Sequence, residues 1–104
     1  MGICNIIDDP RRTPEQWELI SAHVRGSGPV PPDGCRLAMF GTDRVITVWD
    51  SPADRDSFLA ERLAPAYEAA GRSLDEVTRT EFDVEMLIAG DLAGMAQQPA
   101  GAER

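Results

Sequence analysis

A helix-start signal that occurs twice, at Thr13-Pro14 and at Ser51-Pro52, limits the fold of this chain more than any other feature of its sequence. A hydroxyl side chain caps the free amides at the start of a helix, and proline suits the first helical position because it has no amide to leave unpaired. Gln16 lies three residues after Thr13 and completes a capping box. The spacing of apolar residues predicts helices over residues 14–26 and 52–70.

Short segments rich in β-branched and aromatic residues lie on either side of these helices and are typical of strands. The residues Gly41-Thr42-Asp43 separate the middle two segments and predict a hairpin turn. In the second helix, Pro65 predicts a kink because it removes one backbone hydrogen bond, and Gly71 predicts the helix end. The predicted strands cover residues 3–8, 35–40, 44–49 and 78–88.

The order of these segments is β-α-β-β-α-β, which predicts an α+β, ferredoxin-like fold. In that fold a four-stranded antiparallel sheet carries both helices on one face. A chain of 104 residues is long enough for one domain, which we expect to span residues 1–88. Residues 89–104 turn to Gly, Ala, Gln and Pro, so we expect a flexible C-terminal tail there.

The helices leave one face of such a sheet open, and the alternation of side chains along a strand sorts residues between the two faces. An open face needs water, a partner or a ligand. We expect the helix face to carry the more uniformly apolar set, namely Cys35, Leu37, Met39, Ile46, Val48, Phe82, Val84 and Met86. We expect the open face to carry Ile3, Asn5, Ile7, Arg36, Ala38, Phe40, Val45, Thr47, Trp49, Glu81, Asp83 and Glu85.

The composition excludes several kinds of site and partner. There is no lysine, which excludes Schiff-base catalysis and a P-loop, and one histidine with two cysteines cannot supply the usual zinc or iron ligands, so we expect no metal. A net charge of −8 without a basic run argues against nucleic acid, and no apolar run has the length of a membrane span. Because the first residues show no secretion leader, we expect a cytoplasmic protein with reduced Cys4 and Cys35.

Three stretches carry a resemblance to a known family: TPEQW at residues 13–17, VWDS at 48–51 and FLAERLAPA at 58–66. Over residues 3–88 the chain resembles the dimeric α/β-barrel superfamily, and more closely small actinobacterial proteins related to the antibiotic-biosynthesis monooxygenases. The resemblance implies a homodimer in which two open faces form a barrel, and a small-molecule pocket inside it or between sheet and helices. The haem-degrading branch takes a histidine from the second helix, where this chain has none, so we expect no haem and no other cofactor.

Three residues are candidates for catalysis. In the family dimer the second strand lies near the partner's fourth, so Arg36 can pair there with an acid such as Glu85. In a pocket without water, one carboxylate would have a raised pKa and suit a general acid or base. The alternative is a solvated ion pair at the sheet edge. His23 is a candidate base, and the alternative is a histidine whose protonated form is favoured by the helix C-terminus.

Five residues are candidates for substrate binding. Large aromatic side chains can stack on a flat substrate, although at these spacings they also suit a core. Trp49 and Tyr67 each combine an apolar body with a polar group, and Asn5 can orient a substrate oxygen. The predicted substrate-binding set is Asn5, Phe40, Trp49, Tyr67 and Asp83.

These observations lead to one leading hypothesis and two alternatives. The first is a small-molecule enzyme of specialised metabolism, a cofactor-independent monooxygenase that acts on an aromatic or polyketide-like substrate. Such an enzyme needs only to bind, deprotonate and exclude water. The alternatives are an acid–base cyclase or isomerase, and a non-catalytic ligand-binding or interaction module. The residues themselves leave open whether the protein is an enzyme.

Overall fold

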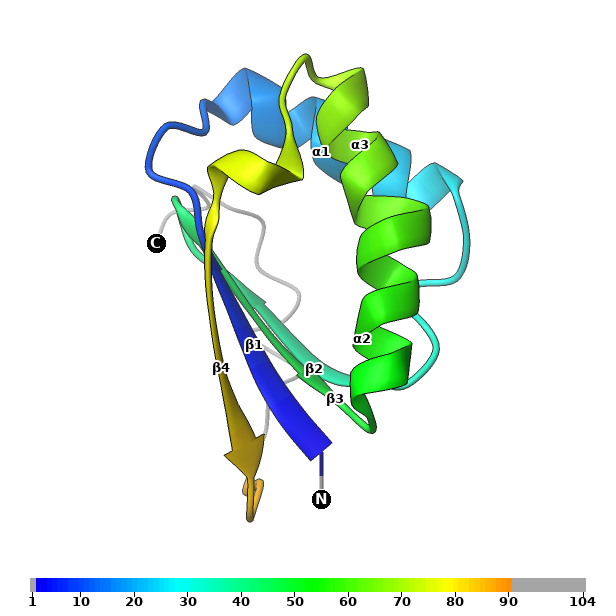
Figure 1. The fold of residues 1–104 in the computed structure, drawn as a ribbon, viewed down its shortest axis with the longest axis vertical. Helices are drawn as coiled ribbons and strands as arrows, with labels where there is room; N and C mark the ends of the chain where they lie inside the picture. Colours follow the sequence, from blue (N-terminus) through cyan, green and yellow to red (C-terminus); the bar gives the residue numbers. More distant parts are fainter. Residues whose placement is uncertain (1, 91–104) are drawn as a thin grey trace.

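A computed structural model describes residues 2–90 of the chain. It has the predicted α+β class, with a four-stranded antiparallel sheet in the order β2-β3-β1-β4 and helices on one face (Figure 1). This arrangement is compatible with a ferredoxin-like fold. No helix within residues 2–90 is long and apolar enough to cross a membrane. The strands are β1 (Gly2–Asp8), β2 (Cys35–Phe40), β3 (Arg44–Trp49) and β4 (Thr78–Val84).

The last strand is shorter than the sequence suggested. β4 ends at Val84 instead of residue 88, opposite Gly2, where its neighbour β1 begins. Residues 85–90 continue without regular structure. Of the expected C-terminal tail, residues 91–104 lie outside the described residues.

The first helix, α1 (Pro14–Gly26), begins as its sequence predicts. The Thr13 hydroxyl accepts a hydrogen bond from the Gln16 amide, and the Gln16 side chain accepts one from the Thr13 amide, each at 3.1 Å. This reciprocal pair satisfies two amides at the helix start and fixes where the chain leaves the loop.

The second helical stretch consists of α2 (Pro52–Phe58), a π-helical turn η1 (Leu59–Leu63) and α3 (Ala64–Ala69). The Ala64 amide donates to the Leu59 carbonyl, a reach of five residues, immediately before Pro65. Proline cannot supply the next amide, so the predicted disturbance takes the form of a widened turn. Gly71, at φ +76°, ends the stretch, and a short 3₁₀ turn, η2 (Leu74–Glu76), leads into β4.

The main core fills the space between the sheet and the helices. Its buried members are Ile7, Ile20, Leu59, Leu63, Ala66 and Tyr67. A second apolar cluster lies on the opposite, helix-free face of the sheet. It consists of Cys4, Val48 and Val84, with Ile6, Leu37 and Ile46 packed against them.

The face assignment from the sequence is wrong for most strand residues. Val45 packs into the main core, the Trp49 ring lies 5.3 Å from the ring of Phe58, and Glu81 pairs with Arg55 of α2. By strand alternation and register, the residues Ile3, Asn5, Ile7, Ala38, Phe40, Val45, Thr47, Trp49, Glu81 and Asp83 therefore face the helices. The open face instead holds Leu37, Met39, Ile46, Val48, Phe82 and Val84.

The physical reason is that both faces of the central strands are apolar, so hydrophobicity alone does not say which face meets the helices. Some polar members of the helix face have partners there: Trp49 donates to Thr47, and Glu81 pairs with Arg55 of α2. Cys35 and Arg36 are the exceptions whose faces were predicted correctly, because a β-bulge between Cys35 and Leu37 interrupts the alternation of β2. Cys35 pairs with Trp49 on the helix side, and Arg36 reaches the open face, as the sequence predicted for both.

Candidate functional site

A hollow of about 330 Å³ lies on the open face where β3 ends. The bulge in β2 turns Arg36 toward Asp50, the residue after β3, and Arg36 Nε donates to Asp50 Oδ1 at 2.7 Å. The Asp50 amide donates to the Gly34 carbonyl at 2.8 Å and holds this corner in place. The hollow is lined by Arg36, Val48, Trp49, Asp50 and Leu87.

This hollow combines apolar walls with one acid and one base. Val48 and Leu87 supply the apolar surface, and Trp49 borders it although its ring packs on the helix side. The hydrogen bond and negative charge of Asp50 raise the pKa of Arg36, so the guanidinium keeps its charge. A guanidinium binds an anionic oxygen, and a carboxylate accepts a proton. Both side chains are exposed, Arg36 by 65% and Asp50 by 47%.

Sequence reasoning found Arg36 but missed Asp50. The available signal was the position of Asp50 directly after Trp49, at a strand end across the hairpin from Arg36. The bulge that brings the two together has no marker in the sequence, because it inserts an ordinary residue rather than a glycine.

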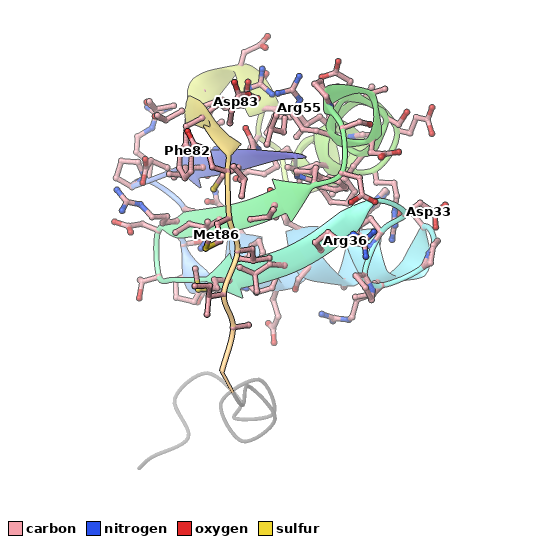
Figure 2. The ribbon with its side chains drawn as sticks, turned by 90° about the horizontal axis from the view of Figure 1, so that it is seen from below. Asp33, Arg36, Arg55, Phe82, Asp83 and Met86 are labelled. Carbon is pink, nitrogen blue, oxygen red and sulfur yellow. The ribbon has the colours of Figure 1, made fainter. Side chains whose placement is uncertain are left out.

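The structure does not bring Arg36 together with the other predicted catalytic residues. β2 and β4 form opposite edges of the sheet, which are separated by three strand spacings, or roughly 14 Å. Figure 2 shows Arg36 toward the β2 edge and Asp83 at the β4 edge. Glu85 directly follows β4 and is exposed, and His23 lies half-buried on α1, in the helix layer. Within one chain, Arg36, Glu85 and His23 therefore do not form one site.

Asn5 and Trp49 belong to a buried polar chain on the helix side of the sheet. Trp49 Nε1 donates to Thr47 Oγ1 at 2.8 Å, and the Thr47 hydroxyl donates to the Asn5 carbonyl at 3.4 Å. Asn5 is 1% exposed, and among residues 2–90 nothing donates to its Oδ1. These side chains lie on the helix side of the sheet, whereas the hollow opens on the other face.

Tyr67 is engaged in a second buried network. Its hydroxyl donates to Asp9 Oδ2 at 2.9 Å, and Arg72 Nη2 donates to Asp9 Oδ1 at 2.9 Å. Burial alone would raise the pKa of Asp9, but the hydrogen bonds from Arg72 and Tyr67 and the charges of Arg72 and Arg12 lower it below its usual value. Burial and the bond to Asp9 raise the pKa of Tyr67 to about 12. Sequence reasoning missed this network because its members are distant in the chain.

Phe40 lies on the helix side, with its ring 5.6 Å from that of Trp17, and much of it is exposed. A further hollow of about 570 Å³ lies between the proline-rich loop and α2. Arg62 crosses it and donates to the carbonyls of Val24 and Pro29. We interpret this hollow as the boundary between the loop and the helices, across which the Arg62 hydrogen bonds hold the loop in place.

No group of three or more His, Cys, Asp or Glu side chains within residues 2–90 is placed to hold a metal ion. Neither a family model, nor a curated protein, nor a solved structure matches this chain. The geometry of the molecule itself therefore carries the functional argument.

Proposed function

We propose that the protein is a homodimeric, cofactor-independent monooxygenase of specialised metabolism that binds an aromatic or polyketide-like molecule in the Arg36–Asp50 hollow. The observation that supports this proposal is the pairing of a guanidinium and a carboxylate on apolar walls, in a hollow near the lower limit of ligand-sized pockets. An acidic phenol or activated methylene needs these two groups, one to take its proton and one to stabilise the anion.

The reaction needs no reagent besides the substrate and molecular oxygen. When oxygen converts an activated methylene to a carbonyl, one oxygen atom enters the product and the other leaves as water with the two methylene hydrogens. The substrate anion supplies the electrons, so the protein has only to form that anion and keep it in place. Asp50 accepts the proton, and Arg36 holds the resulting oxyanion.

The homodimer is supported by the charge distribution. The chain carries a net charge of −8, yet the ion pairs at the two ends of the open face, Arg36–Asp50 and Arg44–Asp8, are each neutral. Between them lie the apolar residues Ile6, Leu37, Met39, Ile46 and Phe82. Two copies can therefore meet on this face without the repulsion that their overall charge would cause.

The test measures oxygen consumption and product mass with an anthrone, whose activated methylene stands in for a polyketide-like substrate. We expect Arg36→Gln and Asp50→Asn each to slow oxygen consumption by at least about tenfold. The double variant Arg44→Gln/Asp8→Asn is the matched control, because that pair has the same Nε–Oδ1 geometry at 2.6 Å on the same face and its joint removal keeps the face neutral. The control should change the rate less than about twofold.

The same assay separates the alternatives. An isomeric product that forms without oxygen uptake would indicate an acid–base cyclase or isomerase and not an oxygenase. Binding without any product would indicate a ligand-binding module. Equal effects of the two pairs would show that the hollow is not the site.

A further inference from the structure

The segment after β4, residues 85–90, forms a strap over the open face. In Figure 2 its path overlaps β1, β3 and β2 in projection, and in Figure 1 it lies at the end of the sheet where β4 finishes. Leu87 lines the same hollow as Val48 and Arg36, so the strap lies on the helix-free side of the sheet. A strap in this position would lie between two sheets if two copies met there.

The apolar side chains of the strap differ strongly in exposure. Leu87 is 38% exposed and lies against the sheet, whereas Met86 is 73% exposed and Ile88 is 83% exposed. The much greater exposure of Met86 and Ile88 places both away from the sheet surface that Leu87 contacts. The strap therefore presents two exposed apolar side chains beside its one charged residue, Glu85.

Two large apolar residues of the open face are about half exposed, namely Met39 of β2 and Phe82 of β4. Met39 lies level with Ile46 and Ile6, whereas Phe82 lies two residues nearer the end where β3 finishes. This group, Ile6, Met39, Ile46 and Phe82, is the open patch, and Leu87 of the strap lies at the hollow beyond it, where β3 ends.

We infer that the strap is the contact element of the dimer: Leu87 rests on its own sheet, while Met86 and Ile88 pack on the partner's open patch. A two-fold axis makes the arrangement reciprocal, so each copy gives a strap and receives one. This inference rests on the homodimer proposed above. Met86, Ile88 and the open patch carry no charge, which favours a second copy over a charged partner.

The first test measures the dimer dissociation constant by analytical ultracentrifugation. We expect Met86→Asp and Ile88→Asp each to weaken the dimer at least about tenfold, because each places a charge in an apolar contact. Leu19→Asp is the control, since Leu19 is a half-exposed residue of α1 on the other layer. Circular dichroism confirms that each variant is folded.

The second test locates the contact. Ile88→Cys chains are mixed with Phe82→Cys chains, both in a Cys35→Ala background, and oxidised. We expect a disulfide between the two different chains, and none when Leu19→Cys replaces Ile88→Cys.

The outcomes distinguish the two proposals. A wild-type protein that is monomeric at micromolar concentration would overturn the homodimer, and the strap contact with it. A wild-type dimer that both strap variants leave unchanged would overturn the strap contact alone. Loss of the dimer without the cross-chain disulfide would also overturn it, because the strap would then act from its own chain.

Discussion

At the scale of single residues, the polar groups differ in how deeply they are buried. Asp9 is 1% exposed and holds Tyr67 and Arg72 together, so it links the end of β1 to α3 and to the turn before β4. The Arg36–Asp50 pair is solvent-accessible and stands beside a hollow. We assign stability to the first group and chemistry to the second, because a buried, fully engaged carboxylate cannot reach a substrate.

Tyr67 provides a prediction about alkaline stability. The folded state holds its proton more tightly, with a pKa of about 12, than the unfolded chain, for which tyrosine has a pKa of about 10. The stability due to this proton is complete below pH 10 and is lost as pH rises from about 10 to about 12.

Tyr67→Phe should remove this pH dependence, and at pH 7 it should cost about 1–2 kcal/mol because Asp9 loses one hydrogen bond. Urea unfolding at pH 7, 9 and 11 measures both effects. The chain has no lysine and no second tyrosine, and the two cysteines, whose pKa values burial also raises, titrate in both proteins, so the difference between wild type and variant isolates Tyr67. A parallel loss of stability above pH 10 in the wild type and the variant would contradict the prediction.

At the scale of elements, glycine and proline determine where helices end and strands begin. Gly71 ends α3 at φ +76°, and a side chain there would contact nothing within 4 Å. Gly34 precedes β2 at φ +81°, and a Cβ there would lie 2.4 Å from Asp54 Cγ. The two positions share a left-handed backbone but differ in the space around them.

Alanine at these positions should therefore have unequal effects. Gly71→Ala should cost about 1 kcal/mol, which is the backbone penalty alone. Gly34→Ala should cost roughly 2–3 kcal/mol, because Asp54 must also move and its hydrogen bond to Ser51 is disturbed. Urea unfolding of both variants gives the difference, and equal costs would show that Asp54 moves aside freely.

At the scale of the whole molecule, the decisive feature is a neutral, apolar sheet face on a strongly acidic chain. An interface built on it depends on apolar burial and not on attraction between charges. The strap and the open patch are the two apolar surfaces that it brings together.

Salt should therefore have little effect on the dimer. Between 50 and 500 mM NaCl we expect the dissociation constant to change by less than about threefold, or to fall as the acidic surfaces are screened. Sedimentation equilibrium at both salt concentrations measures it. A tenfold weakening at high salt would indicate an interface held by ion pairs between chains.

The sequence alone determined the order of the elements, both helix starts, the helix end at Gly71 and the disturbance at Pro65. These features depend on neighbours within about four residues, where capping and proline geometry act. The sequence also contained Arg36 as a candidate, because an arginine within an otherwise apolar strand stands out.

Only the tertiary structure decided which face of the sheet meets the helices. The aliphatic alternation of β3 has two apolar sides, and the choice depends on Trp49 packing against Phe58 and on Glu81 pairing with Arg55. The structure likewise brought Asp50 to Arg36 through a bulge, and Asp9 to Tyr67 across 58 positions of chain. Such contacts arise from long-range packing, which strand alternation and helix propensity do not encode.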